Sequence, residues 1–567
     1  MRASPVPSAF RVHLTAISKS PSTRIVKVGI RAQSSAADVP IAPEQPRHKR
    51  PSDKLTIFTQ PRATKRSVLE KIRSKLSVGP SEPGQLERAA VVLASPRHAS
   101  WLTENGFTAE LVHALHGPFE RGEKFHLLAA VVDGLCARSP SRELQEGISI
   151  HVGRLDGLLP GLWDTTSPGD EAQSLSRSLG DSELPSSLSI LLPQKMTRKD
   201  ARISVTLPLA NTLFSNGRRS TLLASEWTLA TGFSNTRAET VRTVEKRTQV
   251  IDLPASIMFD KVDMRAPLVP ITQPRKILEG LGNILAKVEV AGEPQPASME
   301  LQTNIHRLLD VRRALPHSQS VSGPIGVWAM IYPKHMFLPQ EDIHRFYRSL
   351  QGRYLGSALG KLAFEMSTDS ERLAWENETV LRNAFFEGAR LHKILGGGGE
   401  WGAKASLLSL DPKTSHTPQS EADELDKFMR SFHGEENAKD SIAQPGDFVQ
   451  FFVERDGKQM PPERHHHLKA RSDYPPVKFG CGDMHMGDID RPDSIIMSRR
   501  VDRGHTEQLY FDHFGAHSAE GIYVSSGEIG PNTKIDVPGA SVSMTTVKGS
   551  EAAYRPFVRL HQHRDKQ

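Results

Sequence analysis

The chain has 567 residues, of which 37% are hydrophobic and 24% are charged, a balance that fits two or three globular domains. Two cysteines, Cys136 and Cys481, are too few for a disulfide framework or for a zinc site built from several cysteines. The longest apolar stretch, residues 125–137, is too short for a membrane span and contains Asp133.

The net charge of +7 is concentrated at the start of the chain. Residues 1–80 hold 16 Lys and Arg against 4 Asp and Glu, a net charge of +12, so that the rest of the chain carries −5. A broad basic surface for nucleic acid is therefore not predicted. RNA contact stays an alternative that the bulk charge does not support.

Residues 1–35 have the composition of a mitochondrial transit peptide. Six basic residues and no acidic residue precede Asp38, and serine and threonine are frequent between them. Phe10, Leu14 and Ile17 recur at helical spacing, so a helix here would combine an apolar stripe with basic charge. Cationic, acid-poor amphipathic helices are typical of mitochondrial import signals. We therefore expect a mitochondrial location, with the matrix as the destination.

An N-terminal α/β region is expected over residues 64–160, after a proline-rich, polar and disordered linker at 36–63. Apolar spacing predicts helices over 64–76 and 108–117, strands over 89–95 and 146–155, and a helix or strand over 124–135. The first helix has basic flanks, which leaves two interpretations. It is an ordinary surface helix, or it is a docking helix for an acidic partner or RNA.

A central α/β domain is expected over residues 188–410. The apolar pattern predicts strands over 187–193, 201–209 and 323–333, and helices over 275–290, 299–315, 341–351 and 370–395. Asn216 and Gly217, between two β-compatible segments, are the strongest hairpin signal in the chain. Arg218 and Arg219 follow them, either as part of a plain turn or as contacts for a phosphate.

Four consecutive glycines, residues 396–399, follow the last of these predicted helices. Gly397, Gly399 and Gly402 match the spacing G-x-G-x-x-G, but that dinucleotide motif needs a strand before it and a helix after it. The phosphate-binding P-loop fits no better, because position 403 is alanine and Lys404 comes one residue late. The stretch is thus a near match to two motifs.

Two interpretations of this glycine stretch remain open. In the first, Gly396 ends the preceding helix in a left-handed conformation and the other glycines form a turn. In the second, the loop borders a pocket and its backbone N–H groups form an anion-binding nest beside a lysine. The candidate anion- or nucleotide-binding residues are Gly396, Gly397, Gly398, Gly399, Gly402 and Lys404.

A polar linker is expected over residues 411–444, and a β-rich C-terminal region over 445–567. Strand-like runs lie at 446–457, 493–501, 520–529, 533–547 and 554–561. The region also holds residues of metal-ligand type, namely His465, His466, His467, Cys481, Asp483, His485, Asp488, Asp490, His505, Asp512, His513 and His517. Neighbouring glycines favour solvated loop histidines over a transition-metal site, so no metal is assigned.

The segment GGGGEWGAKASLLSLDP, residues 396–412, resembles a glycine-rich stretch of fungal mitochondrial proteins of unassigned activity. Residues 205–225, VTLPLANTLFSNGRRSTLLAS, resemble the same group. The resemblance implies a mitochondrial location and a place among factors around mitochondrial gene expression. It supplies no catalytic residues and no cofactor.

Together these patterns predict an α/β or α+β fold, with mixed sheets, amphipathic helices, a β-rich C-terminal part and a disordered N-terminus. No complete catalytic motif is present. We therefore expect a soluble, non-enzymatic accessory or assembly factor linked to mitochondrial gene expression, within a mitochondrial protein complex. The alternative is an enzyme that depends on a nucleotide or phosphate ligand bound by the loop at 396–404.

Overall fold

The computed structural model describes sixteen stretches of the chain. They are residues 53–76, 87–116, 123–137, 143–164, 186–193, 202–231, 236–253, 261–314, 325–337, 384–385, 388–397, 406–416, 441–454, 476–483, 508–525 and 532–545. The chain divides into two compact units, Met1–Arg50 and Pro51–Gln567, and all of these stretches belong to the second. The predicted transit peptide at 1–35 lies outside the described residues.

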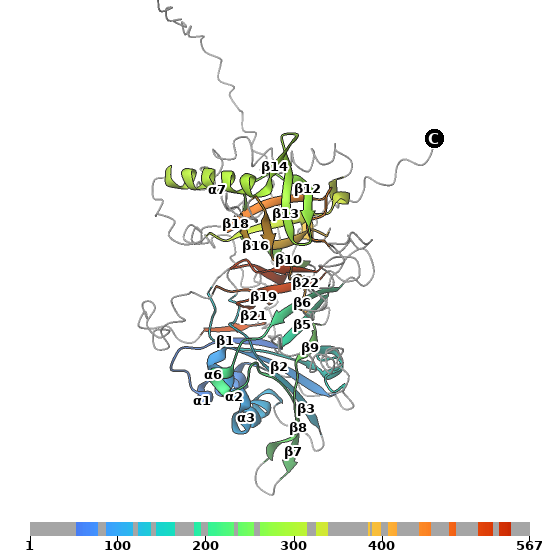
Figure 1. Cartoon of the computed structure of the whole chain (residues 1–567). Coiled ribbons are helices and arrows are strands. Elements are labelled where there is room, and N and C mark those ends of the chain that lie inside the picture. Colours follow the sequence, from blue (N-terminus) through green and yellow to red (C-terminus); the bar gives the residue numbers. More distant parts are fainter. Residues whose placement is uncertain are drawn as a thin grey trace, which may run out of the picture. The chain divides into compact units, whose positions relative to one another are not determined.

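Strands dominate the described fold, and the largest open sheet has seven of them in the order β20-β1-β4-β2-β3-β7-β8 (Figure 1). Their bounds are β1 Lys54–Phe58, β2 Arg88–Ala94, β3 Lys124–Val131, β4 Gly147–Arg154, β7 Leu222–Thr231, β8 Thr236–Glu245 and β20 Gln508–Phe511. β2 and β3 are parallel, and β4 is antiparallel to both β1 and β2, so β1, β2 and β3 run in one direction. Their carboxyl ends therefore meet at one edge.

Three helices cover one face of this sheet. They are α1 Lys65–Lys75, α2 Ala99–Thr103 and α3 Asn105–His116. α1 begins where the Thr64 hydroxyl accepts the Ser67 N–H at 3.2 Å, and its apolar face packs into the same core as Val92 of β2. The helices predicted over 64–76 and 108–117 are confirmed, and the ambiguous run at 124–135 is mainly a strand.

Both faces of β2 are buried, which explains its unbroken run of apolar residues. Val92 points to the helices, while Val91 and Leu93 point to a second core shared with two smaller sheets. One is five-stranded, β23-β22-β6-β5-β9, and the other is four-stranded, β10-β24-β19-β21. Their bounds are β5 Ser187–Pro193, β6 Arg202–Pro208, β9 Thr248–Asp252, β10 Lys261–Arg265, β19 Val477–Cys481, β21 Phe514–Ser518, β22 Ile522–Ser525, β23 Thr533–Ile535 and β24 Ser541–Thr545.

The remaining described strands include a closed six-stranded barrel. β18 pairs with both β12 and β15, which closes the ring β18-β12-β13-β17-β16-β15, and β11 and β14 extend it. The bounds are β11 Leu268–Pro270, β12 Arg275–Leu281, β13 Ile284–Val290, β14 Glu293–Pro296, β15 Val327–Tyr332, β16 Arg390–Gly397, β17 Leu408–Leu410 and β18 Phe448–Glu454. Along β15, Ala329 and Ile331 face the barrel core, whereas Trp328 and Met330 join the second core.

Four short helices and one long helix complete the described elements. They are η1 Pro96–His98, α4 Leu155–Leu158, α6 Leu213–Asn216, α7 Ala297–Ala314 and η2 Lys334–Phe337. α7 contributes Ala297 and Leu301 to the barrel core, and it confirms the helix predicted over 299–315. Among the described residues, no helix is long and apolar enough to cross a membrane.

Several expectations were wrong. Residues 275–290 form the hairpin β12–β13 instead of a helix, because Gly282 turns the chain with a φ of +57° and Ile277, Leu285 and Val288 become buried in one core. Part of the expected linker at 36–63 is β1, a buried strand. The fold is mixed α/β, but with few helices beside many strands.

The predicted strands over 89–95, 146–155, 187–193, 201–209 and 323–333 are confirmed by β2, β4, β5, β6 and β15. Among the C-terminal runs, β18, β22, β23 and β24 account for those at 446–457, 520–529 and 533–547, while 493–501 and 554–561 lie outside the described residues, as do 341–351. The division into regions stays a prediction, although β18 pairs with β12 and β15 across its boundaries at 410 and 445.

Candidate functional site

The carboxyl edge of β1, β2 and β3 is a candidate position for a functional site, because ligands of open α/β sheets often bind there. The connection from β6 to β7 also reaches this edge. The Ala210 N–H donates to the Val131 carbonyl at 3.1 Å, and the Val131 N–H donates to the Thr221 carbonyl at 3.0 Å. A turn at 211–221 therefore lies beside the ends of the parallel strands.

Ser95, at the end of β2, is the centre of a buried polar cluster. Its hydroxyl donates to the Glu146 carboxylate and accepts the Gly147 N–H at 3.0 Å. The His98 Nδ1 lies 3.1 Å from the same oxygen, and the His98 Nε2 lies 3.3 Å from the Thr59 hydroxyl. Because the single hydroxyl hydrogen of Ser95 goes to Glu146, the neutral His98 ring donates its Nδ1–H to Ser95.

This arrangement does not fit a nucleophilic serine. A catalytic histidine must accept the serine proton, whereas His98 donates to Ser95, and no carboxylate backs its other nitrogen. Ser95 is also fully buried. Burial, aided by the Arg97 charge, lowers the pKa of His98 to about 4, while burial raises the pKa of Glu146 against the opposing effects of Ser95 and Arg97. The cluster locks η1 and β4 to the strand ends.

The turn at 211–221 has a backbone fixed by local hydrogen bonds. Asn211 accepts the Leu213 N–H through Oδ1 at 3.0 Å, and α6 follows as a single helical turn. Gly217 ends α6 in the left-handed conformation, with a φ of +76°, and donates its N–H to the Leu213 carbonyl at 3.0 Å. Asn216 and Gly217 thus cap a helix.

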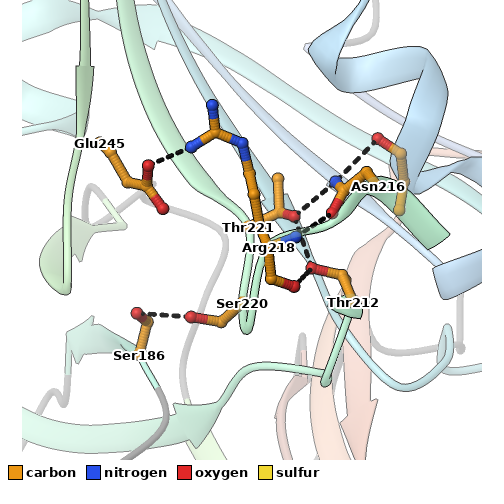
Figure 2. A network of polar contacts seen from close by, with 8 residues as sticks. Ser186, Thr212, Asn216, Arg218, Ser220, Thr221 and Glu245 are labelled. Carbon is orange, nitrogen blue, oxygen red and sulfur yellow. Dashed lines mark hydrogen bonds and ion pairs between the residues drawn. The ribbon is translucent and has the colours of Figure 1, made fainter. Parts of the chain in front are cut away.

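Side-chain hydrogen bonds also stabilise this turn, as Figure 2 shows. The Thr212 hydroxyl donates to the Arg218 carbonyl at 2.8 Å, so the Thr221 hydroxyl donates to Thr212, also at 2.8 Å. The Asn216 amide donates to Thr221 Oγ1 at 2.8 Å, and its oxygen accepts the Arg218 N–H at 3.2 Å. Each bond contributes about 1 kcal/mol in typical proteins, so the turn is ordered before it meets any partner.

Further contacts join the turn to its surroundings. The Asn216 amide reaches the Ala99 carbonyl of α2 at 3.4 Å, and the Ser220 hydroxyl donates to the Ser186 hydroxyl at 2.8 Å. The Arg218 guanidinium forms an ion pair with Glu245 on β8. Polar groups of the turn are thus used to fix its shape.

The tip of the turn is apolar and exposed. Phe214 is 100% exposed and Leu213 is 50% exposed, and Phe214 is the most exposed large hydrophobic residue described. Exposed single apolar residues are common, but a fully exposed aromatic ring on an ordered turn is unusual. We take the turn at 211–221, with Leu213 and Phe214 at its tip, as the candidate site.

The predicted hairpin at Asn216 and Gly217 was wrong. β6 pairs with β5 and β22, whereas β7 pairs with β3 and β8, so the two flanking strands belong to different sheets. Asn216 and Gly217 do form a turn, but that turn ends the helix α6 instead of joining two strands. Arg218 is paired with Glu245, and Arg219 is exposed at the surface.

The predicted glycine site is described only in part. Gly396 and Gly397 lie in the strand β16, so the helix expected up to this point was wrong from Arg390 onward. Gly398, Gly399, Gly402 and Lys404 lie outside the described residues. The segment after them returns as β17, antiparallel to β16, which is the context of neither the dinucleotide motif nor the P-loop. The anion-binding loop stays a prediction.

The end of this stretch, LLSLDP, has structural roles. Leu408 and Leu410 are buried in the barrel core. The Asp411 carboxylate binds the Lys534 ammonium at 3.0 Å, and Asp536 approaches the same ammonium at 3.5 Å. Burial alone would lower the pKa of Lys534, but the two carboxylates together raise it.

The C-terminal candidate ligands are placed in different ways. Cys481, His513 and His517 are buried in or beside strands, so the solvated-loop interpretation was wrong for these two histidines. Two of the glycines that favoured a loop, Gly480 and Gly515, are instead strand positions where a Cβ would clash: at Gly515 it would lie 2.1 Å from the Lys478 carbonyl oxygen. Asp483 and Asp512 are also described, and the other seven lie outside the described residues. Within the described part of the chain, no group of side chains could hold a metal ion.

Sequence reasoning missed Leu213 and Phe214 as site residues. The only signal was a pair of large apolar residues directly before the polar segment SNGRRS, and that pair also fits the end of a buried strand. Comparisons with family models, with curated proteins and with solved structures found no match.

Proposed function

We propose that this chain is a non-enzymatic accessory factor of mitochondria, linked to gene expression, and that it acts by binding through the turn at 211–221. The observation that carries the proposal is the full exposure of Phe214 on a turn whose polar groups hold one another. An exposed aromatic ring gains free energy when a partner removes it from water, which favours binding at this position.

The order of the turn supports binding. A flexible loop loses conformational entropy when a partner fixes it, whereas an ordered one has already met that cost in folding. Aromatic anchors contribute most of the energy at many interfaces. Loops that carry function often stand on a rigid sheet, and this turn is bonded to β3 through Ala210 and Thr221.

The buried cluster at Ser95 supports the non-enzymatic part of the proposal. It is the polar group at the carboxyl edge of the sheet that most resembles a catalytic set, yet its hydrogen bonds run in the wrong direction for a nucleophile. The location and the link to gene expression rest on the acid-free, basic segment 1–35 and on the resemblance of residues 205–225 and 396–412 to fungal mitochondrial proteins.

The location is tested by fusing residues 1–45 to a fluorescent protein. The fusion should enter mitochondria, and entry should require the membrane potential. Fluorescence that stays in the cytosol while the basic residues are intact would contradict the mitochondrial assignment.

The binding role is tested by placing a photo-crosslinking amino acid at Phe214 in the full chain within mitochondria. Leu395, on β16 and 60% exposed, is the control position. We expect discrete adducts from position 214 that include a component of the gene-expression machinery. Adducts at position 395 but none at 214 would count against the turn as the binding element.

A further inference from the structure

We infer that His126 and Trp163 form an acid-sensitive latch, in which the neutral imidazole holds the indole N–H and protonation of the imidazole releases it. The latch goes beyond the proposed function, because it does not involve the turn at 211–221. Leu128 and Ala130 of β3 belong to the second core, so His126, on the same face of that strand, points toward this core as well. Trp163 follows α4 and packs against the edge of the same core.

The hydrogen bonds around His126 determine which of its nitrogens carries the hydrogen. An indole N–H can only donate, and the Trp163 Nε1 lies 3.0 Å from the His126 Nδ1. Nδ1 is therefore the nitrogen without a hydrogen. Nε2 carries it and donates to the Glu87 carboxylate at 2.6 Å. Only the neutral imidazole satisfies both partners at once.

Protonation of His126 is incompatible with its contact to Trp163. The added proton binds Nδ1, so that two N–H groups would face each other across the former hydrogen bond. The bond to Glu87 persists and becomes stronger, because the imidazolium donor is charged. The ring therefore gains its proton as the indole leaves, and a fall in pH favours this released state.

Charged groups face His126 from its own strand and from two neighbouring segments. Glu87 directly precedes β2, Glu226 lies opposite His126 on β7, and Lys124 is two residues away on β3. Burial is the main cause that lowers the pKa of His126 below its usual range; Lys124 adds to this effect, whereas Glu87 and Glu226 oppose it.

The pKa of His126 must be higher in the released state than in the latched state. When the indole leaves, water reaches the ring and the effect of burial weakens, while both carboxylates stay in place. Between the two pKa values, the ratio of released to latched molecules rises by up to about tenfold for each unit by which the pH falls.

The surroundings of Trp163 confine the release to the indole. Leu159 and Leu162 are buried in the second core, so the chain directly before Trp163 stays anchored. On the other side, the Arg242 guanidinium of β8 lies 3.6 Å from the centre of the indole ring, and the Glu226 carboxylate holds Arg242 at 2.7 Å. Release therefore uncovers one face of this guanidinium and leaves the sheet intact.

Fluorine NMR of the full chain labelled with fluorotryptophan follows the indole directly. The chain has six tryptophans, and the resonance that is missing from Trp163→Phe belongs to Trp163. We expect this resonance to move toward that of a solvent-exposed indole as the pH falls from about 7.5 to about 5, across the usual range of histidine titration. The far-UV circular dichroism should not change. A Trp163 resonance that stays in place until the protein unfolds overturns the inference.

Two substitutions separate the latch from general acid sensitivity. His126→Gln keeps an acceptor for the Trp163 N–H and a donor for Glu87 but does not titrate, so the Trp163 resonance should no longer respond to pH. Glu87→Gln still accepts from Nε2 but removes the charge that favours imidazolium, so the transition should move to lower pH.

Glu279→Gln is the matched control for Glu87→Gln. Glu279 belongs to an exposed ion pair on the barrel, and its substitution should leave the midpoint of the Trp163 transition unchanged. An unaltered transition in His126→Gln, or equal midpoints in Glu87→Gln and Glu279→Gln, overturns the latch.

A reciprocal measurement needs no substitution at His126. Hydrogen–deuterium exchange of the imidazole C–H groups, followed by mass spectrometry, reports the pKa of each histidine. Trp163→Phe removes the N–H that occupies Nδ1, so the pKa of His126 should rise, whereas that of His392, buried on β16, should stay the same. A pKa of His126 that is unchanged or lower in Trp163→Phe contradicts the coupling between the two rings.

Discussion

Position 397 requires glycine for a structural reason that the neighbouring residues in the sequence do not indicate. Its φ is +142°, and a Cβ there would lie 2.1 Å from the Leu407 carbonyl oxygen, because β16 and β17 approach closely at this point. At Gly396, one residue earlier, a Cβ would meet nothing within 4 Å. Adjacent glycines of the same run thus have different constraints.

We expect Gly397→Ala to destabilise the fold by more than about 1 kcal/mol, since alanine is strained at this φ and clashes with backbone. The matched control, Gly396→Ala, should change the unfolding free energy by at most about 0.5 kcal/mol. Chemical denaturation of both variants measures the difference. Equal effects at the two positions would show that the close approach at Gly397 is not what limits substitution.

The sequence marked the glycine run as special, but it did not reveal why. A glycine after apolar residues of helical spacing resembles a helix cap, and the same letters serve a strand that bends against its neighbour. The cluster of Ser95, His98 and Glu146 was equally hidden. Ser95 and Glu146 are 51 positions apart, and only the pairing of β2 with β4 brings them together.

At the scale of elements, the turn at 211–221 depends on Thr212. Thr212→Val keeps the shape of the side chain but removes the bonds to Arg218 and Thr221. We expect amide hydrogen exchange within the turn to speed up at least about fivefold, the equivalent of losing about 1 kcal/mol. Exchange in α3 should stay unchanged. Ser215→Ala, at an exposed position of the same turn, is the control and should have no effect.

The spacing of apolar residues predicted α1, α3 and α7 correctly, but it failed where the pairing of distant strands determines the structure. α1, α3 and α7 each have one apolar face at helical spacing, and each was predicted. Residues 275–290 have the same spacing, yet the turn at Gly282 folds them into β12 and β13. The partners of these strands, β18 and β17, lie far along the chain, so a local pattern does not contain the information.

For the molecule as a whole, the Lys534 cluster joins the barrel to the five-stranded sheet. Asp411 follows β17, whereas Lys534 belongs to β23. Lys534→Met would leave the carboxylates of Asp411 and Asp536 without their cation, and breaking such a buried pair typically costs about 3–5 kcal/mol. Thermal unfolding should show the loss.

Lys287→Met is the control for this prediction. Lys287 pairs with Glu279 at the surface, where both side chains are more than half exposed, and exposed pairs contribute about 0–1 kcal/mol. Similar losses in the two variants would mean that the Lys534 cluster does not stabilise the fold more than a surface pair does.

Buried neutral histidines should make the whole fold sensitive to acid. Burial is the main cause that lowers the pKa of His151 and His392 to about 4 and that of His517 to about 3. Nearby charges modify this: Lys54 and Asp53 for His151, Arg390 and Asp411 for His392, and Lys478 for His517. The unfolded chain binds these protons near pH 6.5, so stability is full above that pH and falls as the pH drops toward 4.

We expect about 2 kcal/mol to be lost per histidine between pH 7.5 and 5, as an upper value. His151→Gln keeps a donor for the Asp53 carbonyl, which lies 3.3 Å from the ring nitrogen, and removes one titrating group. Urea unfolding at the two pH values should then show a smaller pH dependence in the variant. An unchanged pH dependence would contradict the assignment of a buried neutral ring to His151.

The order of strands along the chain has a consequence for biosynthesis. The closed barrel draws every strand from residues 268–454, whereas the other three sheets each need strands from beyond residue 507: β20, β21 with β24, and β22 with β23. A chain that emerges from its amino end can therefore close the barrel early, while β1, β6 and β10 wait with open edges for partners still unmade. Such edges favour aggregation, so the three sheets stay exposed to wrong pairing until the last strands have been made.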